Sequence, residues 1–148
     1  MMDNATPETQ ETTMEYLDFD RHLSLGIPAI DEQHREIFQL LNDLIDASET
    51  ENRDKIQDTL GRIKRYTKFH FVSEERYMES SEYRDINEHS RLHNECSSKI
   101  RDIERRYKNG EDISITETIE FLRGWFLNHI KESDRLYAPE TVSSSVSR

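Results

Sequence analysis

The chain has 148 residues, and its 20 Lys and Arg against 31 Asp and Glu give a formal net charge of −11. This length suits a single domain with one core. With only 4 Gly and 3 Pro, the composition favours helices and excludes the collagen-like, sandwich-like and disulfide-scaffold classes. The acidic charge argues against nucleic acid and anionic lipid as partners.

The sequence favours a cytoplasmic protein. Cys96 is the single cysteine, so no intramolecular disulfide can form. The N-terminus lacks the basic and apolar regions of a signal peptide. No apolar stretch approaches the roughly 18 residues that a membrane-spanning helix needs.

The chain divides into a flexible N-terminal tail (1–15), one folded domain (16–140) and a flexible C-terminal tail (141–148). The domain opens with an arm over residues 16–29, which ends at Gly26-Ile27-Pro28. Four helices are predicted after the arm, at about Asp31–Ala47, Arg53–Ser80, Ile86–Lys108 and Ile115–Leu136. Asp31 is predicted to be the N-cap of the first helix, and Ser114 with Glu117 forms a capping box before the last.

Each predicted helix carries a stripe of core residues at alternating steps of three and four. The first stripe, for example, contains Ile30, His34, Ile37, Leu41 and Leu44. This spacing is typical of the seam of a helix bundle, and short connections favour antiparallel neighbours. The predicted fold is therefore all-α, an up-down-up-down antiparallel four-helix bundle with an N-terminal arm.

Six polar residues interrupt these stripes: His34, His70, Glu74, His89, His93 and His129. Burying them is costly unless they share partners. His70 and Glu74 are four residues apart, as are His89 and His93, so each pair projects from one helix face. Imidazole with carboxylate suits iron, zinc or copper better than calcium or magnesium. Five imidazoles exceed one tetrahedral zinc site, so two ions sharing bridging carboxylates fit the count better.

A second bridging carboxylate is predicted at Asp134. It follows His129 by five residues, which is not a helical repeat, and the regular inward position would be Ser133. The spacing therefore predicts one wide turn of the π-bulge type.

Metal-free alternatives remain at this stage. Any one of the histidines could be an ordinary core residue, and together they could form a buried hydrogen-bond network. His22 lies in the arm, outside every stripe, and is expected at the surface. Cys96 lies on a core stripe, where a small buried side chain is favoured over a metal ligand.

Four segments together resemble the bacterial hemerythrin family: residues 26–34, 70–75, 89–93 and 125–134, followed by Tyr137-Ala138-Pro139. The resemblance implies two non-haem iron ions (Fe2+/Fe3+) with a bridging oxo or hydroxo group. His89, His93 and His129 would hold one iron, His34 and His70 the other, and Glu74 and Asp134 would bridge them. The iron with two histidines would keep an open position for dioxygen.

The family resemblance also implies that Trp125, Phe126 and Ile130 line the oxygen pocket. The sequence departs from the family at two places. The arm has Tyr16-Leu17-Asp18-Phe19-Asp20 where many members have a tryptophan, and Phe126 stands where leucine is frequent. We expect the bulk of Phe126 to alter oxygen affinity and autoxidation.

The function that follows is reversible dioxygen binding for storage, delivery or sensing, without a catalytic residue. The alternatives are a di-iron enzyme that reduces nitric oxide or peroxide, an iron storage or detoxification protein, and a metal-free helical interaction module. A sensor could act through an unidentified protein partner, and the sequence does not define an oligomeric state.

Overall fold

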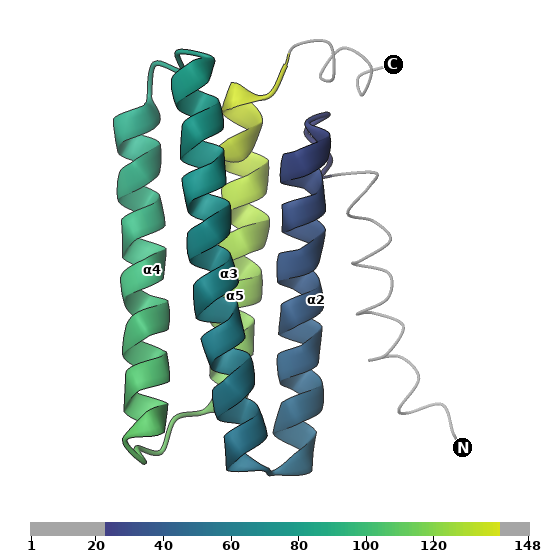
Figure 1. Ribbon diagram of the computed structural model, residues 1–148, viewed down its shortest axis with the longest axis vertical. Helices are drawn as coiled ribbons and strands as arrows, with labels where there is room; N and C mark the ends of the chain where they lie inside the picture. The colour runs from purple at the N-terminus through teal and green to yellow at the C-terminus, as the bar shows by residue number, and fades with distance from the viewer. Residues whose placement is uncertain (1–22, 140–148) are drawn as a thin grey trace, which may run out of the picture.

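The computed structural model describes residues 23–139, which form four long helices and a short terminal turn (Figure 1). The helices are α2 (Pro28–Thr50), α3 (Arg53–Ser80), α4 (Ile86–Lys108) and α5 (Ile115–Glu132). The 3-10 helix η3 (Asp134–Tyr137) follows α5. Both predicted tails, His22 and the Tyr16–Asp20 part of the arm lie outside the described residues.

Successive helices run in opposite directions, as the prediction of an antiparallel four-helix bundle requires (Figure 1). Helix α3 packs against α2 and α4, and α5 packs against α2. Only two residues, Glu51 and Asn52, join helices α2 and α3. Because this connection is so short, the chain must reverse its direction there. The all-α class is confirmed, and within residues 23–139 no strand is found. No helix in this range is both long and apolar enough to cross a membrane.

Local sequence signals explain where the helices begin. The Asn52 side chain caps α3 by accepting a hydrogen bond from the Lys55 backbone N–H at 3.2 Å. The Ser114 hydroxyl caps α5 in the same way, accepting from Glu117 N–H at 3.1 Å. The predicted limits of α3 and α4 are confirmed at both ends.

The prediction of Asp31 as a helix N-cap is wrong. Helix α2 begins at Pro28, because proline fits the first helical position, where no N–H is needed. Asp31 lies in the first turn, buried, and its carboxylate accepts hydrogen bonds from the backbone N–H groups of Leu25 (2.8 Å) and Gly26 (3.2 Å). The Ser24 hydroxyl donates a third, at 2.9 Å. Asp31 therefore fastens the end of the arm onto α2.

The predicted π-bulge near Asp134 and the extension of the last helix to Leu136 are also wrong. Helix α5 ends at Glu132, and Ser133 N–H still bonds the His129 carbonyl, at 2.8 Å, in α-helical fashion. The chain then tightens into η3, where Leu136 N–H bonds the Ser133 carbonyl at 3.2 Å. A break followed by a narrower turn, rather than one wide turn, brings Asp134 inward.

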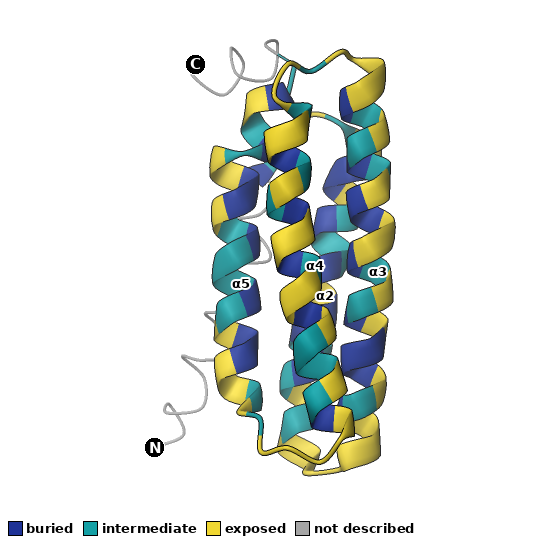
Figure 2. Cartoon of the chain, turned by 90° about the vertical axis from the view of Figure 1, so that its left-hand side faces the viewer, coloured by how far each residue is buried: buried dark blue, intermediate teal, exposed yellow. Residues whose placement is uncertain are grey.

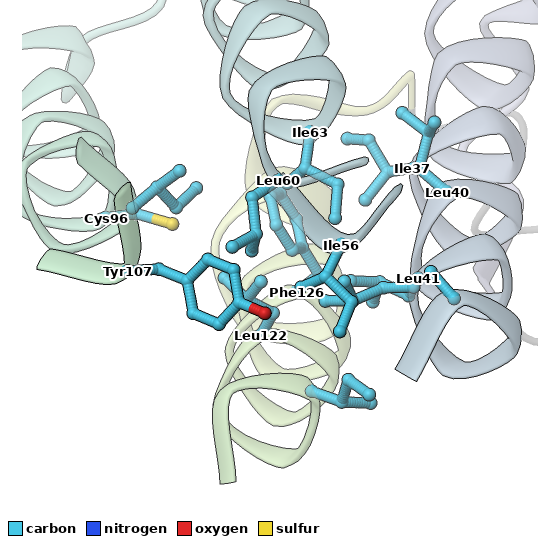
Figure 3. Packing of buried hydrophobic residues seen from close by; sticks show 14 of the residues in the cluster. Ile37, Leu40, Leu41, Ile56, Leu60, Ile63, Cys96, Tyr107, Leu122 and Phe126 are labelled. Atoms are coloured by element: carbon cyan, nitrogen blue, oxygen red, sulfur yellow. The ribbon is translucent and has the colours of Figure 1, made fainter. Parts of the chain in front are cut away.

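Buried residues lie on the inner faces of the helices (Figure 2). The apolar core fills the half of the bundle that contains the α2–α3 connection, where side chains such as Leu41, Leu60 and Leu122 interdigitate (Figure 3). A second group, the cap cluster, closes the opposite end with Leu23, Leu25, Ile30, Met78, Ile130 and Tyr137. The polar stripe residues lie between these two apolar groups.

Candidate metal centre

The seven residues predicted as ligands lie together in the interior, and none is more than 5 % exposed. Their ligand atoms form two groups, each within 4.8 Å, of which one contains Glu74, His89, His93, His129 and Asp134. The other contains His34, His70, Glu74 and Asp134. Both carboxylates belong to both groups, so the groups adjoin.

The three-histidine group is held by α4 and α5, with its imidazoles converging through their Nε2 atoms. The Nε2 atoms of His93 and His129 are 3.2 Å apart, and those of His129 and His89 are 2.9 Å apart. His89 and His93 share a face because they are one helical turn apart on α4. Three basic nitrogens so close together can all serve one cation.

The two-histidine group joins α2 to α3. The rings of His34 and His70 meet edge to face, with centroids 4.6 Å apart. His34 Nε2 lies 3.2 Å from Asp134 Oδ2, and His70 Nε2 lies 3.7 Å from Glu74 Oε2. This group therefore offers two nitrogens where the other offers three.

Each carboxylate divides its two oxygens between the two groups. Glu74 Oε1 lies 2.7 Å from His93 Nε2, whereas Glu74 Oε2 lies 3.6 Å from His34 Nε2. Asp134 Oδ1 lies 2.8 Å from His89 Nε2 and 3.0 Å from His129 Nε2, whereas Oδ2 faces His34. A carboxylate in this position can donate one oxygen to each of two neighbouring cations.

Two histidines are oriented by polar side chains that the sequence analysis did not single out. His70 Nδ1 lies 2.8 Å from the Gln33 amide oxygen, and His93 Nδ1 lies 2.8 Å from Glu75 Oε2. Both partners accept, so each Nδ1 carries the proton and each Nε2 lone pair faces the interior. Gln33 precedes His34 and Glu75 follows Glu74, so adjacency to candidate ligands was the available signal.

Tyr137 is a third residue that sequence reasoning did not place at the centre. Its hydroxyl donates a hydrogen bond of 2.6 Å to Glu74 Oε2. Burial, followed by the negative charges of Glu74 and Asp134, raises the pKa of this phenol well above its ordinary value. Tyr137 therefore stays protonated and holds the Glu74 carboxylate in place.

Aromatic rings shield the three-histidine group. Phe71 stacks on His93 with centroids 3.9 Å apart, and Trp125 stacks on His129 at 4.4 Å. Among the predicted pocket residues, Phe126 and Ile130 are buried and Trp125 is half-buried. Phe126 belongs to the apolar core and Ile130 to the cap cluster, so they lie on opposite sides of the centre. Their role as an oxygen pocket stays a prediction.

The charges of the centre are strongly coupled in the metal-free protein. Burial lowers the pKa of His34 and of His89, but the carboxylates of Asp134 and Glu74 raise each more, to about 9. Burial also lowers the pKa of His70, to about 4. For Glu74, burial raises the pKa, but the surrounding imidazoles lower it by more. The pKa of Glu74 therefore lies well below its ordinary value. Without a metal ion, the ionised carboxylates would therefore lie beside protonated imidazoles of His34 and His89.

The donor set fits a metal better than it fits a closed hydrogen-bond network. Within residues 23–139, Glu74 Oε1 and both Asp134 oxygens are buried and accept no hydrogen bond of good geometry, although imidazole Nε2 atoms lie 2.7 Å from Glu74 Oε1 and 2.8 Å from Asp134 Oδ1. Buried carboxylate oxygens without such partners are costly. Three imidazole Nε2 atoms and two carboxylates that converge at these distances are the donor set that a transition-metal cation accepts.

Cys96 takes no part in either group. It is buried in the apolar core, and burial raises the pKa of its thiol to about 12. It behaves as the small buried side chain that was expected.

The fold and this cluster define a four-helix-bundle metalloprotein. The model of the hemerythrin HHE cation binding domain matches residues 25–141. Bacteriohemerythrin of Methylococcus capsulatus is 35% identical over 109 residues, 74% of this chain and 83% of that protein. Bacteriohemerythrin of Stenotrophomonas maltophilia is 35% identical over 118 residues, 80% of this chain and 76% of that protein.

A solved structure supports the same relationship. The crystal structure of a wild-type hemerythrin superposes with a TM-score of 0.73 at 34% identity, covering 76% of this chain and 86% of that one. The chain therefore belongs to the hemerythrin family. Membership implies the binding of non-haem iron, for which the buried His, Glu and Asp cluster is suited.

Proposed function

We propose that this protein binds dioxygen reversibly at a centre of two iron ions joined by an oxo or hydroxo group. His89, His93 and His129 would hold one iron, and His34 and His70 the other. Glu74 and Asp134 would bridge them. The observation that carries the proposal is the division of each buried carboxylate between the two histidine groups.

The imbalance of ligands supports a binding position on one side of the centre. The group of His34 and His70 offers one imidazole fewer than the other group. Two ferrous ions held there would supply the electrons for binding dioxygen in a reduced form. Because the five imidazoles are neutral, two ferrous ions would bring more positive charge than two carboxylates and a hydroxo bridge remove, and the remaining positive charge would favour an anionic ligand.

The surrounding residues would protect such a site. Gln33 and Glu75 hold two imidazoles in one tautomer, and Tyr137 holds Glu74. Phe71, Trp125 and Phe126 would exclude water and so slow the loss of bound ligand to solvent.

The alternative of an enzyme that reduces nitric oxide or peroxide calls for a proton donor near the centre. The Tyr137 hydroxyl donates a hydrogen bond to Glu74, but its raised pKa makes it a poor donor of protons at neutral pH. The residues therefore favour a binding protein over an enzyme. Whether binding serves storage, delivery or sensing depends on the oxygen affinity.

Metal content and visible spectra test the proposal. The reduced protein is examined without oxygen, then in air, then after the oxygen is removed. We expect two irons per chain and a charge-transfer band that appears with air and disappears when oxygen is removed. A band that forms once and persists would favour the enzyme, and fewer than two irons would contradict a two-metal centre.

A further inference from the structure

A hollow of about 430 Å³ lies between α3 and α4, the two neighbouring helices on one side of Figure 1. Two of its lining residues, Thr67 and Ile100, are buried and form its floor. Four basic side chains line it as well: Lys64, Arg65, Lys68 and Arg101. As formed by residues 23–139, this α3–α4 hollow is lined by no Asp or Glu.

Three of these cations have no acidic partner in the described part of the chain. Lys64 pairs with Glu104 at 3.0 Å, but Arg65, Lys68 and Arg101 form no ion pair between residues 23 and 139. Arg101 contacts the Ser98 hydroxyl, at 3.2 Å. In a protein of net charge −11, carboxylates are plentiful, and the exposed Arg91, for example, pairs with Glu88 at 2.6 Å. Neighbouring unpaired cations repel one another and favour an anion between them.

The floor of the hollow contributes an independent observation. Thr67 is only 1 % exposed, and its hydroxyl has no hydrogen-bond partner among residues 23–139. By contrast, the hydroxyls of the buried Thr59 and Thr118 each have a hydrogen-bond partner. Each donates to the backbone carbonyl four residues earlier, at 2.9 Å. A buried hydroxyl left without a partner beneath a basic rim is suited to an acceptor that enters the hollow.

We propose that the α3–α4 hollow binds a small multivalent oxyanion of the phosphate class, such as inorganic phosphate or pyrophosphate. Guanidinium groups grip phosphate oxygens in pairs, an ammonium adds charge, and the Thr67 hydroxyl would donate from below. No aromatic side chain lines the hollow within the described residues, so the phosphoryl group rather than a base would be recognised. A concave site with a buried floor fits a free anion better than a flat lipid surface. This inference does not rest on the proposed dioxygen function.

Calorimetric titration of the iron-loaded full chain with pyrophosphate, at low ionic strength, tests the site. The triple variant Arg65→Gln, Lys68→Gln, Arg101→Gln should weaken binding more than about tenfold, because each lost contact to the anion is charge-assisted. The matched control, Lys55→Gln, Arg84→Gln, Lys108→Gln, removes the same charge from exposed positions elsewhere. We expect its affinity to stay within about twofold of the parent. Because pyrophosphate chelates iron, the iron content is measured before and after titration.

Thr67→Val separates a ligand-binding hydroxyl from a merely buried one. Valine keeps the shape of threonine, so iron content and melting temperature should be retained, while pyrophosphate affinity falls about fivefold to tenfold. Unchanged affinity in this variant, equal losses in the two triple variants, or no heat with the parent would each overturn the proposal. Binding to vesicles containing phosphatidic acid, without binding of free pyrophosphate, would also overturn it.

Discussion

The two halves of the bundle use the same helices and the same spacing of inward residues, but they close in different ways. In the apolar core, side chains such as Leu41, Leu44 and Leu60 fill the interior and stabilise it by burial alone. In the other half the equivalent positions hold imidazoles and carboxylates, which cannot satisfy one another fully. The difference indicates that one half is stabilised by its own side chains, whereas the donor groups of the other half are suited to a cation.

Replacing Glu74 should have the largest effect, a loss of iron from the polar half of the bundle. Glu74→Ala deletes one bridging carboxylate and leaves cationic charge buried without compensation, so iron content should fall from about two per chain to well below one. Elemental analysis with protein quantification measures it. Glu79→Ala, an exposed glutamate on the same helix, is the control and should keep its iron. Retention of two irons by the Glu74 variant would contradict its role as a bridge.

Leu44→Ala tests the other half. Leu44 is fully buried, and its truncation should lower the free energy of unfolding by about 3 kcal/mol through lost burial and a cavity. Denaturant unfolding of the iron-loaded protein measures this loss. Iron content should be unchanged, because the cavity forms below the metal centre. If iron were lost as well, the two halves would not be independent.

A smaller and graded effect is expected from pH. His34 and His89, whose pKa values are raised to about 9 in the metal-free protein, are protonated at pH 7 and must release these protons to bind a metal. Iron affinity should therefore rise as pH increases towards 9 and fall as pH decreases. Anaerobic calorimetry in buffers of different ionisation enthalpy should detect release of about two protons per centre at pH 7. Uptake without proton release would contradict the charge state derived for the metal-free cluster.

The smallest change is expected from Phe126→Leu, at the boundary between the two halves. Phe126 is buried and its ring lies 5.0 Å from that of Trp125. A smaller side chain should keep both irons and change the autoxidation rate, because it alters the space beside the centre. The decay of the oxygenated spectrum in air measures that rate. An unchanged rate would remove Phe126 from the predicted pocket.

Much of this architecture was predictable because it rests on periodicity. The stripes predicted four helices, and histidines within them predicted that side chains from all four would meet. The limits of α3 and α4 followed from Asn109-Gly110 and from polar breaks, which are local signals.

What the sequence did not predict depends on contacts distant along the chain. Asp134 reaches the centre because the helix ends at Glu132 and a tighter turn follows, and no repeat in the sequence distinguishes this from a π-bulge. Tyr137 contacts Glu74 from 63 residues away, and Gln33 contacts His70 from 37 residues away. Such pairings follow from packing rather than from local spacing.

The three hydrogen bonds that the Asp31 carboxylate accepts also determine how a pulling force on the arm reaches helix α2. Its carboxylate binds two backbone N–H groups and one hydroxyl of residues 24–26, and it does so one turn before His34. A pull on the chain ahead of residue 23 would load these three bonds before it displaced His34.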